Sequence, residues 1–162
     1  RLTCVEGLTT QKDTLEELYL AHNAITDEGA CHLTGLGLTF TELGTLDLSR
    51  NVLTSTRPLA HLSSLTDLWL SGNNISSFEQ IEPLTDNLTH LDTIYLEYNP
   101  LQQDFEYRKK VKELIPSLTQ IDANQIAGVS FPCGGGQAET LEDQMRRLQD
   151  MAVQRAKGKG GG

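Results

Sequence analysis

The stretch Leu65-Thr-Asp-Leu68-Trp-Leu70-Ser-Gly-Asn73-Asn-Ile75 decides the fold of this 162-residue chain. Its leucines are spaced three and then two residues apart, and an asparagine comes three residues after the last of them. The same spacing recurs at Leu15–Ile25, Leu43–Leu53 and Leu91–Leu101. Successive asparagines of the pattern are 28, 22 and 26 residues apart. Self-similarity at a period of about 20–29 residues is typical of a chain built from stacked repeats.

The spacing matches the leucine-rich-repeat template and predicts an α/β solenoid. In each repeat the alternating segment forms a short strand whose leucines point inward and stack on the next coil. The asparagine turns the chain, and its amide bonds backbone groups left unpaired at the turn. We expect parallel strands near 18–20, 46–48, 68–70 and 94–96. They form a curved parallel sheet on the concave face, with helices or 3₁₀ turns on the convex face.

The segments between the repeats predict how the convex side folds, and the first residues predict how the chain begins. Leu59 and Leu62 supply inward anchors of the 22-residue unit. In the 28-residue unit, Asp27 is a candidate N-cap of a helix over Glu28–Leu36. Arg1-Leu2-Thr3 aligns with Val52-Leu53-Thr54, so we expect the chain to begin partway through a repeat and further repeats to precede it.

A capping segment is expected after the last repeat. Asp104 is a candidate N-cap of a cap helix over Phe105–Leu114, stopped near Pro116. The half-repeat Leu118–Asp122 follows and imitates one last strand. A helix and a half-repeat over the final coil would close the solenoid at its C-terminal end.

The chain therefore divides into four predicted parts. Residues 1–126 form the leucine-rich-repeat domain, including the cap at 102–126. A glycine-rich linker follows at 127–138. Residues 139–157 form an amphipathic helix on the spacing of Leu141, Met145, Leu148 and Ala152, which is either loosely held or a docking and self-associating element. Residues 158–162 form a disordered tail.

The concave face is the candidate binding site. Strand alternation sends Tyr19, Asp47, Trp69 and Tyr95 to the centre of this face, so three of the four central residues are aromatic. Every charged residue at the central and flanking positions is acidic, as Glu17 and Asp67 illustrate. Exposed aromatic rings among charges are typical of a protein-binding hot spot. The predicted partner-binding residues are Trp69, Tyr95, Asp47, Asp67, Tyr19 and Glu17.

Composition excludes several other functions. The net charge of −9 disfavours binding to nucleic acid, which requires a basic surface. No apolar run approaches the length of a membrane span. The four histidines lack metal-ligand spacing, and no catalytic constellation or cofactor motif is present, so we expect neither an enzyme nor a cofactor. Three cysteines without a CxxC pair indicate reduced thiols, typical of the nucleus or cytoplasm.

Five stretches carry a family resemblance: Leu15-Glu-Glu-Leu-Tyr-Leu-Ala-His-Asn23, Leu68-Trp-Leu70, Ile94-Tyr-Leu-Glu-Tyr-Asn-Pro-Leu101, Tyr107-Arg-Lys-Lys-Val111 and Ile121-Asp-Ala123. Together they resemble the leucine-rich-repeat regulatory subunit 7 family of protein phosphatase 1. The resemblance implies a non-catalytic regulatory subunit whose concave face clasps the phosphatase catalytic subunit in the nucleus and cytoplasm. It matches Trp69 and Tyr95 best to contacts at the strand centres, and then Asp47 and Asp67.

The cap motif is shared by a wider superfamily and leaves an alternative open. Similar caps occur in the U2 spliceosomal A′ protein, an axonemal dynein light chain and an mRNA export factor. The alternative is therefore a leucine-rich-repeat adaptor of an axonemal dynein or spliceosomal ribonucleoprotein assembly. In that case the same solenoid would grip a different protein.

Overall fold

Six strands form one sheet in chain order in the computed structural model, which describes residues 1–33 and 40–126. The strands are β1 (Glu17–Tyr19), β2 (Thr45–Asp47), β3 (Asp67–Trp69), β4 (Thr93–Tyr95), β5 (Gln120–Ile121) and β6 (Asn124–Gln125). β1 to β5 pair in parallel, and β6 turns back antiparallel to β5. The predicted leucine-rich-repeat solenoid is confirmed, with each of the four repeat strands beginning one residue earlier than expected.

The inward leucines stack in register from coil to coil. Leu18 pairs with Leu46, Leu46 with Leu68, and Leu68 with Ile94. Leu46, Leu68 and Ile94 are completely buried, whereas Leu18 in the first coil is half-buried. This ladder forms the core, because each coil can bury its apolar face only against its neighbours.

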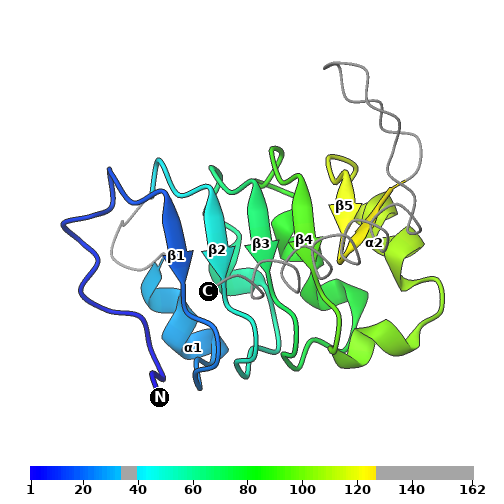
Figure 1. Cartoon of the computed structure of the whole chain (residues 1–162), viewed down its shortest axis with the longest axis horizontal. Coiled ribbons are helices and arrows are strands. Elements are labelled where there is room, and N and C mark those ends of the chain that lie inside the picture. The colour runs from blue at the N-terminus through cyan, green and yellow to red at the C-terminus, as the bar shows by residue number, and fades with distance from the viewer. Residues whose placement is uncertain (34–39, 127–162) are drawn as a thin grey trace, which may run out of the picture. The chain divides into compact units, whose positions relative to one another are not determined.

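Short helical segments cover the opposite side of the sheet (Figure 1). Leu59 and Leu62 are buried there, as predicted. The segments are α1 (Asp27–Ala30), η1 (Cys31–Leu33), η3 (Arg57–Leu59), η4 (Phe78–Gln80), η5 (Glu82–Leu84) and η6 (Pro100–Gln103).

The first helix is shorter than predicted and has a different cap. Thr26 is the N-cap, and its hydroxyl accepts from the N–H of Gly29 at 3.1 Å. Asp27 is instead the first helical residue, and its carboxylate reaches the next coil, where it accepts from the N–H of Thr54 at 2.8 Å. Asp27 therefore joins two coils, a role that the local capping pattern could not reveal. The predicted end of the helix at Leu36 lies outside the described residues.

A ladder of asparagine side chains joins each coil to the one before it. The Asn73 amide donates to the carbonyl of Leu70 in its own coil and to that of Leu48 in the preceding coil, at 2.9 and 3.0 Å. Its carbonyl oxygen accepts from the N–H of Leu53 at 3.0 Å. Asn51 and Asn99 make the corresponding bonds. All three are buried, so each amide satisfies backbone groups that water cannot reach.

The cap helix α2 (Tyr107–Leu114) begins later than predicted. Asp104 is not its N-cap. It adopts an extended backbone after η6, and its carboxylate accepts from the N–H of Glu106, the residue that precedes the helix. Tyr107 and Val111 are buried, whereas Phe105 is 94% exposed and does not belong to the apolar side. The extended residue at 104 turns the chain before the helix starts, which leaves Phe105 outside the core.

Two side-chain oxygens end the backbone ladder at the last coil. In earlier coils the N–H of Leu48 or Leu70 donates to a carbonyl of the next strand. At β4 the corresponding N–H of Leu96 donates to the carboxylate of Asp122 at 2.9 Å, as does that of Glu97 at 3.0 Å. Gln102 likewise accepts from the N–H of Tyr98 at 2.7 Å. The cap thus substitutes side-chain acceptors for a missing coil.

Asp122 is completely buried, and its carboxylate also contacts the hydroxyl of Tyr107 and Nε of Arg108. Burial raises the pKa of the Asp122 carboxyl, while the N–H groups of Leu96 and Glu97 oppose that shift. The structure thus explains how the half-repeat predicted at 118–122 closes the solenoid.

The linker at 127–138, the helix at 139–157 and the tail at 158–162 lie outside the described residues and stay predictions. The same holds for docking or self-association through that helix. No helix in the described part of the chain is long and apolar enough to cross a bilayer.

Replacing Asn73 with alanine should destabilise the protein by about 3 kcal/mol or more, because each stranded buried polar group costs about 1–3 kcal/mol. Equilibrium unfolding in urea measures the change. The neighbouring Asn74→Ala is a matched control, since Asn74 is exposed. Equal stability of the two variants would contradict the ladder.

Replacing Asp122 with alanine should cost about 2–4 kcal/mol, because the N–H groups of Leu96 and Glu97 lose their acceptor. Asp122→Asn retains a side-chain oxygen at this position and should cost clearly less. Urea unfolding of the two variants, side by side, separates the acceptor role from the charge. An equal loss in the two variants would show that the charge of Asp122 and its ion pair with Arg108 dominate over the acceptor role.

Candidate functional site

The predicted site residues come together on the strand face, the concave face of the solenoid. Tyr19, Asp47, Trp69 and Tyr95 occupy matching positions on β1 to β4. One row to the side, Glu17, Thr45, Asp67 and Thr93 also match. We call the first four the central row. Because neighbouring strands lie about 4.8 Å apart, the central row presents its side chains at a fixed spacing.

Three aromatic rings of the central row form one cluster. Tyr19 and Trp69 meet edge to face with their ring centroids 6.0 Å apart, and Trp69 meets Tyr95 in the same way at 5.8 Å. Tyr19 and Trp69 belong to strands that are not neighbours, so their rings meet across β2, which carries Asp47 between them. Edge-to-face pairs add about 0.5–1.5 kcal/mol each beyond their burial. The rings are therefore held in place before any partner arrives.

Trp69 is less exposed than its position at a strand centre predicts. Its side chain is half-buried between the two tyrosines, and the indole Nε1 is buried without an acceptor among the described residues. Tyr19 remains 55% exposed. The alternation rule places a residue on a face, but it does not show that neighbouring rings will cover part of it.

The acids around the cluster lack cationic partners. No described Lys, Arg or His forms an ion pair with Glu17, Asp47 or Asp67. Asp47 instead accepts from the N–H of Ser49, and Asp67 from the hydroxyl of Thr66, both at 2.8 Å. These bonds orient the carboxylates and leave their charge uncompensated. The surface therefore favours a basic partner.

Two hydrogen bonds position the tyrosines of the central row. The hydroxyl of Tyr19 donates to Glu17 at 2.8 Å, and this bond, with the neighbouring acidic charges, raises the pKa of Tyr19. Gln120 donates to the hydroxyl of Tyr95 at 2.9 Å. Sequence analysis missed Gln120, although its place one residue before Ile121 in the half-repeat puts it beside β4.

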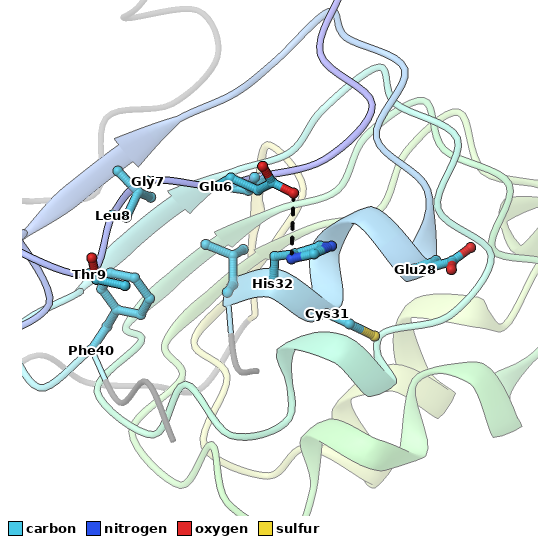
Figure 2. Close-up of a pocket in the computed structure, with 10 residues that line it drawn as sticks. Glu6, Gly7, Leu8, Thr9, Glu28, Cys31, His32 and Phe40 are labelled. Carbon is cyan, nitrogen blue, oxygen red and sulfur yellow. Dashed lines mark ion pairs between the residues drawn. The ribbon is translucent and has the colours of Figure 1, made fainter. Parts of the chain in front are cut away.

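A separate hollow of about 710 Å³ lies near the N-terminal end and is not part of the central row. Figure 2 shows Leu8 and Phe40 on its wall, with Glu6 and His32 joined by an ion pair of 3.9 Å. Leu33 and Phe40 flank residues 34–39, which lie outside the described part of the chain. Its described walls are mainly apolar and include one acid–histidine pair.

Metal binding finds no support in residues 1–33 and 40–126. No group of three or more His, Cys, Asp or Glu side chains there is placed to hold an ion. The chemistry available on the concave face is therefore recognition by ring stacking, hydrogen bonding and charge.

The leucine-rich-repeat families match two parts of the chain. Residues 12–30 match one description, "Leucine Rich repeat", and residues 64–86 match another, "Leucine Rich Repeat". These matches cover the first and third of the four repeats and agree with the observed coils.

Curated relatives confirm the resemblance to phosphatase-1 regulatory subunits. The chain is 46% identical over 78 residues to the protein phosphatase 1 regulatory subunit SDS22 of Schizosaccharomyces pombe, covering 46% of the chain and 24% of that protein. It is 61% identical over 33 residues to human protein phosphatase 1 regulatory subunit 7, covering 20% of the chain and 9% of that protein. These relatives are named as regulatory subunits and not as enzymes, in agreement with the expected lack of catalysis.

A third relative matches over a longer stretch. Mouse centrosomal protein of 72 kDa is 33% identical over 117 residues, covering 72% of the chain and 18% of that protein. The chain thus spans a quarter or less of the length of each of these three relatives.

A solved structure shares the fold. In the Drosophila melanogaster SNF/U2A′ complex, one chain superposes with a TM-score of 0.61 at 23% identity, covering 90% of this chain and 73% of that chain. At this level of identity the likeness concerns the solenoid alone.

Proposed function

We propose that this leucine-rich-repeat chain is a non-catalytic regulator that binds the catalytic subunit of protein phosphatase 1 through its concave face. The observation that carries the proposal is the ring cluster of Tyr19, Trp69 and Tyr95 among unpaired carboxylates. The similarity to SDS22 and regulatory subunit 7 supports protein phosphatase 1 as the partner. The proposal includes location in the nucleus and cytoplasm, where that phosphatase would be met.

The geometry supports this function in two physical steps. Rings that are already packed against each other lose little conformational freedom on binding, which lowers the entropic cost of association. The unpaired acids attract a basic surface and speed its approach. The packed rings thus form a central aromatic anchor, and the acids around it give the surface a negative potential.

An adaptor in another assembly is the second candidate. It is favoured by the match to the centrosomal protein, which covers more of the chain than the SDS22 match does. Affinity capture with the full chain, followed by mass spectrometry, separates the two candidates. Recovery of a phosphatase catalytic subunit supports the first, whereas dynein, centrosomal or ribonucleoprotein components without phosphatase support the second.

Replacing Trp69 or Tyr95 with alanine should weaken binding to the catalytic subunit by about 2 kcal/mol or more, which is roughly 30-fold in Kd. Isothermal titration calorimetry measures it. Phe105→Ala is the matched control, because it removes an exposed aromatic ring outside the central row.

The Trp69 variant also loses both ring contacts, so its melting temperature should fall. Binding must therefore be measured well below that temperature. Unchanged affinity in a folded Trp69→Ala/Tyr95→Ala double variant would exclude the central row as the phosphatase site.

Replacing Asp47 or Asp67 with asparagine should lower the association rate more than it raises the dissociation rate, because these charges act mainly during approach. Stopped-flow measurements at increasing salt should show the difference from wild type shrinking as the charges are screened. Glu82→Gln, an exposed acid on η5, is the control for net charge. A deficit that persists unchanged in high salt would show that the carboxylates act by direct contact instead.

A further inference from the structure

A second row of side chains borders the concave face at the carboxyl ends of the strands. It consists of the four residues directly before Asn23, Asn51, Asn73 and Asn99. All four have a left-handed backbone, with φ of 60° at His22, 55° at Arg50, 69° at Gly72 and 60° at Tyr98. We call this row the rim. Residues other than glycine rarely adopt this conformation. His22, Arg50 and Tyr98 nevertheless adopt it, and the side chains of all three are exposed to solvent. Large side chains therefore occupy positions at which glycine would cause the least backbone strain.

Gly72 leaves a gap in the rim between Arg50 and Tyr98. A hollow of about 490 Å³ opens there, and its walls include Ser49, Ser71 and Glu97. A Cβ atom at position 72 would lie 3.2 Å from Cγ of Arg50, so the aliphatic stem of Arg50 lies over Gly72. We call this hollow the rim notch. Since Ser49, Ser71 and Glu97 follow β2, β3 and β4, the notch adjoins the concave face.

The charge of Arg50 opposes that of the face beside it. All the charged residues in and beside the central row are acids, and none of them forms an ion pair with Arg50. Within residues 1–33 and 40–126, Lys12, Arg108, Lys109 and Lys110 each have a carboxylate partner, but Arg50 has neither an ion pair nor a side-chain hydrogen bond. An unpaired guanidinium at the border of an acidic surface presents five donors to whatever covers that surface.

A partner that is uniformly basic would meet repulsion at this point. Its positive groups would be attracted by Asp47 and Asp67 but repelled by Arg50. A carboxylate at the border of the basic surface removes the conflict, because guanidinium binds carboxylate through paired hydrogen bonds. The hydroxyls of Ser49 and Ser71 supply further donors in the same hollow, and together with Arg50 they must outweigh the repulsion from the Glu97 carboxylate on its wall.

We propose that the rim notch binds a carboxylate side chain of the same protein partner that covers the acidic concave face, with Arg50 as its principal ligand. This inference rests on the proposed function and adds to it a rule of recognition. The partner must be basic over the central row and acidic opposite Arg50. Arg50 then determines specificity, since a surface of basic residues alone would be disfavoured.

Reversing the charge of Arg50 tests the proposal. Long-range electrostatics alone would predict that a more negative chain binds a basic partner more tightly, whereas the notch predicts weaker binding. Arg50→Glu should weaken binding of the phosphatase catalytic subunit at least tenfold. Arg57→Glu changes the net charge equally at an exposed arginine on η3 of the convex side. It should leave the affinity unchanged or raise it slightly, because a more negative chain attracts a basic partner more strongly.

A second variant fills the notch without changing the charge. Asparagine tolerates the left-handed backbone, so Gly72→Asn should fold, place its side chain against the Arg50 stem and weaken binding several-fold. Thermal melting verifies that each variant is folded. Calorimetry and surface plasmon resonance should give the same order of affinities, with wild type tightest, Gly72→Asn weaker and Arg50→Glu weakest, and that order would support the notch.

The outcomes separate the two proposals. If the wild-type chain does not bind the catalytic subunit, the proposed function fails, and the notch inference fails with it. If the wild type binds and depends on Trp69, but Arg50→Glu behaves like Arg57→Glu, only the notch inference is overturned. Tighter binding by Arg50→Glu would also overturn it.

Discussion

The stacking of coils in this structure depends on the asparagine at each turn, which is buried in every coil but the first. A strand of three residues followed by a sharp turn leaves carbonyl and N–H groups that neither the sheet nor water can satisfy. One amide satisfies two carbonyls and one N–H at once, as Asn73 does for Leu70, Leu48 and Leu53. Since one carbonyl and the N–H belong to the preceding coil, the same side chain that closes a turn also fixes the stacking of coils.

The same constraint shapes the surface. The chain reaches each ladder asparagine through a residue with a left-handed backbone, which points its side chain to the border of the concave face. The place of Arg50 at the border of the acidic face therefore follows from where the turn must lie. The C-terminal end obeys the rule in another form, because Asp122 and Gln102 supply the acceptors that a further coil would have supplied.

Periodicity in the sequence was enough to predict the fold, the direction of the strands and the residues of the central row. These follow from contacts that repeat in every coil, such as Leu46 on Leu68. The predictions that failed concern single contacts between particular coils. Asp27 matched a local cap but bonds Thr54 of the next coil. The bounds of the cap helix also failed, because Phe105 was expected to begin it but precedes it. The ring cluster that half-buries Trp69 spans β1 to β4, so no pattern within one repeat could have revealed it.

The repeats differ in length, yet the strands keep one register. The unit between Asn23 and Asn51 has six residues more than the unit between Asn51 and Asn73, and the pairing of Leu18 with Leu46 is nevertheless equivalent to that of Leu46 with Leu68. Within the described residues, the longer unit carries α1 and η1 on the convex side, where the shorter unit carries η3. Evolution can therefore lengthen or shorten the back of the molecule without moving the side chains of the binding face. The two faces can diverge independently, and a designer could exchange convex segments while retaining the recognition surface.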